Sequence, residues 1–209
     1  MTFRAAFIAD GSSDLPIADH LATLCVERGA AVVVTPVDRS LLGDVGSTVK
    51  GRLDYLLGQS PGLDLIFVHR DAEAQPPDQR RREIADAASD LGAAVPVVPV
   101  VPVRMTEAWL LLDEGAIRSV AGKPEGRATL TMPRPADVES LPNPKAVLMK
   151  LLLDASEVRG RRRVANFQRD FGRHRALLIQ RLDLSAGVRH LTAWRQLEAD
   201  LDRVFQQAS

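Results

Sequence analysis

The sequence predicts an α/β fold: a parallel sheet of about four strands, flanked by helices and followed by a helical C-terminal part. Short runs rich in Val and Ile alternate with stretches of helical pattern that are long enough to cross back over a sheet. Beyond Arg104 the apolar residues recur at helical spacing instead. In such a fold ligands bind beyond the carboxyl ends of the strands, so the residues that follow the strands are the first candidates for chemistry.

Four strands are expected, at residues 3–9, 31–37, 63–69 and 95–103. Helices are expected between them, the first opening within residues 10–14 and ending near residue 28, the others at about 48–57 and 77–91. The fourth strand contains Pro96, Pro99 and Pro102, which cannot donate hydrogen bonds to a sheet. It is therefore expected at an edge or a bend.

The C-terminal part is expected to contain helices at about residues 105–113, 143–153 and 191–205. The last of these has apolar residues at spacings of three and four, namely Leu191, Trp194, Leu197, Leu201 and Phe205. Prolines and glycines within residues 122–142 predict a long loop. Residues 1–115 are thus expected to form an α/β core, and residues 116–209 a loop plus a helical extension packed on that core.

Composition limits the class of protein. A chain of 209 residues with 45% hydrophobic and 26% charged residues can bury a core without disulfides. The single cysteine, Cys25, lies in an apolar helical pattern and is expected to be buried. The apolar run at residues 5–9 is too short for a signal peptide, and no later run approaches the roughly 18 residues of a membrane span. A cytoplasmic protein without a membrane partner is expected.

The formal net charge is zero, but the charge is distributed unevenly. Residues 1–142 carry 14 Lys and Arg against 20 Asp and Glu, whereas residues 143–195 carry 12 against 4. This division suits an enzyme that holds a metal in one place and phosphates in another. A solvated basic helix surface is the alternative interpretation of the second segment.

Carboxylates follow two strands that should be near neighbours. Asp10 and Asp14 follow the first strand, and Asp71 and Glu73 follow the third. Because oxygen ligands suit Mg²⁺ and Mn²⁺, these four residues are the candidate metal ligands, and such a site favours phosphoryl transfer. The alternatives are that the first pair caps the following helix and that the second pair lies in a solvated loop.

Glu107 lies near the expected end of the fourth strand and could add a carboxylate to this site. An interaction with the helix dipole or a salt bridge to Arg104 would explain it equally well. Of the four histidines, only His69 stands beside the predicted site. Ser12 and Ser13 are expected to cap a helix, since no motif supplies a histidine base. The sequence contains no phosphate-binding loop, dinucleotide fingerprint or zinc motif.

The candidate phosphate-binding residues are those nearest to the acidic clusters in sequence: Arg70, Arg104, Lys145 and Lys150. The run from Arg159 to Arg163 could follow a phosphate backbone further out, whereas Arg80 to Arg82 are expected on a solvated helix face. Only 4% of the residues are aromatic, so an extended base-stacking surface is not expected.

Four segments together resemble a small family of uncharacterised prokaryotic proteins with a TOPRIM-like fold: residues 10–14 (DGSSD), 68–73 (VHRDAE), 104–113 (RMTEAWLLLD) and 142–145 (PNPK). The resemblance covers roughly residues 3–155, and its most specific part is the EAWLL segment. It implies that the α/β core is TOPRIM-like.

In the wider TOPRIM group of topoisomerases, primases and nucleases of the overcoming-lysogenization-defect type, a glutamate after the first strand serves acid-base chemistry. An Asp-x-Asp pair after the third strand binds Mg²⁺. The resemblance transfers the first role to Asp10 and the second to Asp71 and Glu73. Asp10 is one methylene shorter than the family's residue and Glu73 one methylene longer, which changes their reach towards a metal.

The resemblance thus implies a Mg²⁺- or Mn²⁺-dependent phosphodiesterase or nuclease acting on DNA or RNA, in some cases beside an ATPase partner in phage defence. Asp10, Asp71, Glu73 and Glu107 are then the expected catalytic residues. The alternative is a non-catalytic TOPRIM-like binding or regulatory subunit of an ATPase-containing complex, which the departures at positions 10 and 73 favour. A homo-oligomer is compatible with either function.

Overall fold

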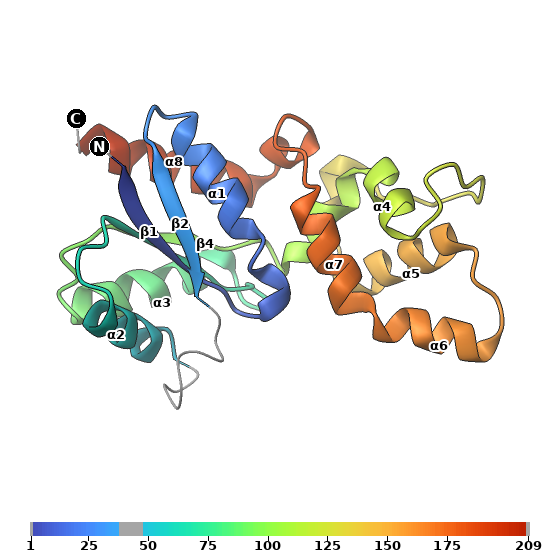
Figure 1. Cartoon of the computed structure of the whole chain (residues 1–209), viewed down its shortest axis with the longest axis horizontal. Coiled ribbons are helices and arrows are strands. Elements are labelled where there is room, and N and C mark those ends of the chain that lie inside the picture. Colours follow the sequence, from blue (N-terminus) through green and yellow to red (C-terminus); the bar gives the residue numbers. More distant parts are fainter. Residues whose placement is uncertain (1, 38–47, 208–209) are drawn as a thin grey trace.

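The computed structural model of the chain describes residues 2–37 and 48–207 (Figure 1). Within these residues, a sheet of four parallel strands has the order β2-β1-β3-β4. The strands are β1 (Phe3–Ile8), β2 (Val32–Val37), β3 (Leu65–His69) and β4 (Val97–Val100). The predicted α/β class, with its parallel sheet and helical C-terminal part, is confirmed.

The two central strands are the most deeply buried. Phe7 of β1 pairs in register with Phe67 of β3, and both side chains are fully buried. β4 lies at one edge of the sheet, where Pro99 is opposite Val68. The edge position predicted from the prolines is therefore confirmed. Proline has no backbone N–H, so it fits an edge strand, where an outward-facing N–H would have no neighbouring strand to bond.

Helices cover both faces of the sheet (Figure 1). Because neighbouring residues of a strand point to opposite faces, Ala5 and Phe7 pack in one core with α1 (Ile17–Val26) and α8 (Thr192–Gln207). Ala6 and Ile8 pack in a second core with α2 (Val49–Gln59) and α3 (Pro77–Asp90). The C-terminal helix thus returns to the sheet.

The remaining elements form the helical part on the right of Figure 1. These elements are η3 (Thr106–Leu112), α4 (Glu114–Val120), η4 (Pro135–Ser140), α5 (Pro144–Ser156), α6 (Arg161–Arg169), α7 (Phe171–Gln180) and η5 (Gly187–His190). A further short 3₁₀ helix, η1 (Ser12–Asp14), belongs to the sheet region. The first core continues into this part without interruption. Trp109 of η3 and Trp194 of α8 meet edge to face, with ring centroids 5.0 Å apart.

Three sequence predictions differ from the structure. The helix expected at residues 105–113 is the 3₁₀ helix η3, and α4 begins immediately after Asp113. The loop expected at residues 122–142 contains η4. Helices α4, α6 and α7 lie outside the helix ranges expected from the sequence. In the part of the chain that is described, no helix combines the length and apolar character needed to cross a bilayer.

Candidate functional site

The carboxyl ends of β1 and β3 open into a pocket with a volume of about 450 Å³. Five carboxylates contribute to its wall, from Asp10, Asp14, Asp71, Glu73 and Glu107. The sheet brings them together because parallel strands end at the same edge, and η3 adds Glu107 from beyond β4. All the acidic residues that the sequence nominated therefore line one pocket.

Arg175 of α7 lies between two of these carboxylates. Its Nη2 is 2.6 Å from Asp14 Oδ1, and its Nε donates to Glu107 Oε1 at 3.1 Å. Its Nη1 donates to Ser13 Oγ at 2.6 Å. The side chains of Arg175, Asp14 and Glu107 are each no more than 7% exposed. A buried guanidinium thus ties α7 to the acidic end of the sheet.

Asp71 is held by a chain of hydrogen bonds. Its Oδ1 accepts from the backbone N–H of Thr106 at 3.0 Å and from the Thr106 hydroxyl at 3.2 Å. The same hydroxyl is 2.9 Å from Nε2 of His69, which is fully buried. Because the hydroxyl gives its one hydrogen to an ionised Asp71, it accepts from His69 Nε2–H.

The other side of His69 faces Asp14. Its Nδ1 is 4.0 Å from Asp14 Oδ2 and makes no hydrogen bond with any described residue. At 4.0 Å this separation is too long for a hydrogen bond. The close ion-pair partner of Asp14 among the described residues is therefore Arg175, at 2.6 Å.

The pKa of Asp71 is raised above its ordinary value. Burial is the main cause, and the neighbouring carboxylates of Asp14 and Glu107 act in the same direction. His69 and Arg175 oppose the shift without cancelling it. The charged form of Asp71 is thus held at a free-energy cost, which a bound cation would relieve.

Asp10 has different surroundings. Its carboxylate is 3.3 Å from Arg52 Nη1 and 3.6 Å from Arg70 Nε, so two guanidinium groups already neutralise it. The alternative that Asp10 and Asp14 cap a helix is wrong, because the residues at the N-terminal ends of η1 and α1 are Gly11 and Pro16. Capping by Ser12 or Ser13 is excluded for the same reason.

Glu73 lies at the rim of the pocket. Its side chain is 67% exposed and its carboxylate is 3.8 Å from Arg80 Nη2. Its backbone has a φ of 54°, in the left-handed region, and its N–H donates to the carbonyl of Arg104. The expectation of a solvated position suits Glu73, but Asp71, with a side chain only 21% exposed, does not share it.

The four candidate phosphate-binding residues are dispersed. Lys145 lines the pocket, with Nζ 5.8 Å from the centre of the Phe171 ring. Arg70 contacts Asp10 and Glu83 instead, and Lys150 pairs with Asp154 on its own helix. Arg104 does not line the pocket. The salt bridge suggested between Arg104 and Glu107 is absent from the described residues, since Glu107 pairs with Arg175.

Sequence reasoning missed Arg175 and the bridging role of Thr106. Arg175 is separated from Glu107 by 68 residues and from Ser13 by 162, so no local spacing indicated the contact. The excess of basic residues in 143–195 was the one available signal. Thr106 lies in the RMTEAW segment, but its hydroxyl could be assigned a partner only once η3 was placed against β3.

The donor set suits a metal held by few protein ligands. Over residues 2–37 and 48–207, no group of three or more His, Cys, Asp or Glu side chains is arranged to hold an ion. Mg²⁺ and Mn²⁺, however, need only one or two carboxylates when water and substrate phosphates complete the shell. Oδ2 of Asp71 accepts no hydrogen bond from any described residue, so it is free for such a role.

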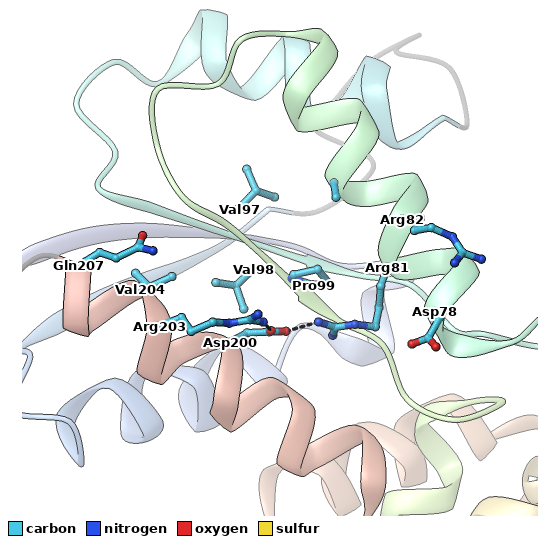
Figure 2. Close-up of a pocket in the computed structure, with 11 residues that line it drawn as sticks. Asp78, Arg81, Arg82, Val97, Val98, Pro99, Asp200, Arg203, Val204 and Gln207 are labelled. Atoms are coloured by element: carbon cyan, nitrogen blue, oxygen red, sulfur yellow. Dashed lines mark hydrogen bonds and ion pairs between the residues drawn. The ribbon is translucent and has the colours of Figure 1, made fainter.

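A larger hollow of about 600 Å³ lies elsewhere, along the outer edge of β4 between α3 and α8 (Figure 2). Asp200 of α8 occupies its centre and pairs with Arg81 at 2.6 Å and with Arg203. The charges in this groove are therefore largely satisfied within the protein. None of the predicted site residues lines it, so we assign the candidate site to the smaller acidic pocket.

Comparison of the chain with protein-family models, curated proteins and solved structures gave no match. The TOPRIM resemblance therefore stays a prediction, and the site is interpreted from its own geometry.

Proposed function

We propose that the acidic pocket binds Mg²⁺ or Mn²⁺ and that the protein is a metal-dependent phosphodiesterase acting on nucleic acid, a nuclease. One observation carries the proposal: the carboxylates of Asp14 and Glu107 share one guanidinium, that of Arg175, and a third carboxylate, Asp71, lies within electrostatic reach of the same group. Three largely buried carboxylates with only one guanidinium destabilise the fold unless a further cation binds to them.

Asp71 and Asp14 would hold the ion, with Asp10 and Glu73 nearby on the same wall. When bound, the metal supplies charge neutralisation at the phosphate and lowers the pKa of water. Asp71 is suited to ligation because burial raises its pKa, so that it gains more than an exposed aspartate from a neighbouring cation. Thr106 and His69 orient this carboxylate by the hydrogen bonds described above.

Glu107 is the best-placed group for proton transfer. Asp10 is held between two arginines, whereas Glu107 lines the same pocket with a single ion-pair partner. In hydrolysis, water attacks phosphorus as the bond to the leaving oxygen breaks. Glu107 would accept the proton of the water, and solvent would protonate the leaving oxygen. Lys145 would offset the negative charge of the phosphate at the pocket wall.

The proposal is tested by incubating the protein with labelled single-stranded and double-stranded DNA and RNA, with Mg²⁺, with Mn²⁺ or with a chelator. We expect cleavage that requires the metal and that is lost in Asp71→Asn. An exposed carboxylate on α3 provides a matched control, Asp86→Asn, which should cleave like the wild-type protein. Cleavage that persists in chelator, or equally in Asp71→Asn, would reject the proposal.

A second candidate is a non-catalytic binding or regulatory subunit of an ATPase-containing complex. The specific observation in its favour is that Arg175 already pairs with both Asp14 and Glu107, in the place that a bound cation would take. In that case the ion pairs serve to join α7 to the sheet. Absence of Mn²⁺ binding, together with copurification of an ATPase, would favour this function over the first.

A further inference from the structure

The chain contains two Arg-Arg-Arg triplets, and they differ in what they contact. In α3, Arg80 pairs with Glu83 at 2.9 Å and Arg81 pairs with Asp200 at 2.6 Å. In α6, the triplet of residues 161–163 has no carboxylate partner among the described residues. The first triplet is thus largely consumed by intramolecular ion pairs, whereas the charges of the second are unpaired.

Helix α6 also differs from the other helices in its burial. It contains no buried residue. Six exposed arginines lie on it or beside it, at Arg159, Arg161, Arg162, Arg163, Arg169 and Arg173, and none forms an ion pair within the described part of the chain. A helix gains most of its stability from a buried apolar face, and like charges repel one another. The composition of α6 is therefore unfavourable for the isolated protein and suits a surface that an anionic partner neutralises.

This basic segment adjoins the candidate site. Asp170 alone separates α6 from α7, whose Phe171, Gly172 and Arg175 line the acidic pocket. Figure 1 shows α6 running from the outer end of the helical part towards α7. The pocket wall carries five carboxylates but only two cations, Lys145 and Arg175, so without a metal it offers little attraction to phosphates. Lys145 is the one cation at the pocket wall without an ion pair among the described residues, so most of the affinity for a polyanion must come from outside the pocket; α6 and its flanks hold the largest group of unpaired arginines close to it in sequence.

We propose that α6 and its flanking arginines form a nucleic-acid-binding surface that holds the phosphate backbone next to the acidic pocket. The inference rests on the proposed function for the identity of the bound polymer as nucleic acid. A nuclease must hold its substrate strand while the strand is cleaved in the acidic pocket. Arginine contacts to phosphate carry no base information, so binding is independent of sequence. Binding is also independent of the metal, because the cations belong to the protein.

The test is the binding of a short fluorescein-labelled single-stranded DNA, followed by anisotropy in the presence of chelator over a series of salt concentrations. The variant replaces Arg161, Arg162 and Arg163 by Gln; all three are exposed, so folding should be retained, as circular dichroism would verify. The matched control removes three exposed cations from other elements, with Arg82→Gln, Lys123→Gln and Arg195→Gln.

For the wild-type protein, we expect the logarithm of the binding constant to fall linearly with the logarithm of salt concentration. The α6 variant should bind at least about tenfold more weakly at low salt, and its slope should be smaller by about 2, the value for three lost contacts to a single strand. The control should keep the wild-type slope. Equal losses in both variants, or no loss in the α6 variant, would overturn the proposal.

The outcome separates this inference from the proposed nuclease activity. DNA binding that depends on α6, without any metal-dependent cleavage, would support the surface and reject the catalytic proposal. Metal-dependent cleavage, with DNA binding unchanged in the α6 variant, would support the catalytic proposal and reject the α6 surface. Displacement of the DNA by poly-glutamate at equal charge concentration would assign the surface to an acidic protein partner and overturn its assignment to nucleic acid.

Discussion

Thr106 donates both its backbone N–H and its hydroxyl to one carboxylate oxygen of Asp71, at 3.0 and 3.2 Å. The two bonds fix Oδ1 against η3 and leave Oδ2 without a hydrogen bond from any described residue. The hydroxyl also accepts from His69, so it is the only link in the described residues between the imidazole and the carboxylate at hydrogen-bond distance. The position of Asp71 at the strand end is thus set by a residue 35 positions away.

Thr106→Val removes this hydroxyl while keeping the shape of the side chain. The buried His69 Nε2–H then has no acceptor, and we expect a loss of about 1 to 3 kcal/mol in the free energy of unfolding, measured in urea. Thr106→Ser keeps the hydroxyl and should lose about 1 kcal/mol, the value of one buried methyl group. Equal stability of the Val and Ser variants would show that the bridge contributes nothing.

Asp71→Asn should stabilise the protein at neutral pH. The folded-state pKa of Asp71 lies above the ordinary 3.8 because of burial, so the stability that this residue contributes is full below pH 3.8 and is lost as the pH rises through the raised value. Asn keeps an oxygen acceptor for Thr106 without the buried charge. We expect a Tm higher by on the order of 2 to 4 °C at pH 7, with the difference shrinking in acid. A lower Tm at pH 7 would contradict this account.

Arg175→Ala should be strongly destabilising. It leaves the buried carboxylates of Asp14 and Glu107 without their cation, which typically costs about 3 to 5 kcal/mol. Arg134→Ala is the matched control: its ion pair with Asp137 is exposed, so its removal should barely change the free energy of unfolding. Urea unfolding measures both. Adding Asp14→Asn and Glu107→Gln to Arg175→Ala should recover part of the lost stability. If Arg175→Ala changes the stability as little as Arg134→Ala does, the buried ion-pair network is refuted.

The acidic half of the site could be predicted from sequence because its position follows from topology. Once residues 3–9 and 63–69 are recognised as parallel strands, Asp14 and Asp71 are expected at the same end of the sheet, beyond the carboxyl ends of these strands. The edge position of β4 followed from its prolines in the same way. These inferences need only local patterns and one general rule of parallel sheets.

The basic half could not be predicted, because it depends on how α7 packs. Arg175 reaches Asp14 only when the helical part folds back onto the strand ends, and nothing in the spacing of residues 171–180 indicates that contact. Helix α6 escaped prediction for a different reason: it has only two apolar residues with partly buried side chains, Val164 and Phe167, which are too few to give a clear apolar stripe. Residues 38–47, between the expected second strand and the following helix, lie outside the described residues.

The central claim is that Asp71 and its neighbours hold a divalent cation, and calorimetric titration of the intact protein with Mn²⁺ tests it most directly. The account predicts saturable binding that weakens at least about tenfold in Asp71→Asn and is unchanged in Asp86→Asn, with folding of both variants verified by their Tm. Saturable binding of equal strength in all three proteins, or no binding to the wild-type protein, would contradict it.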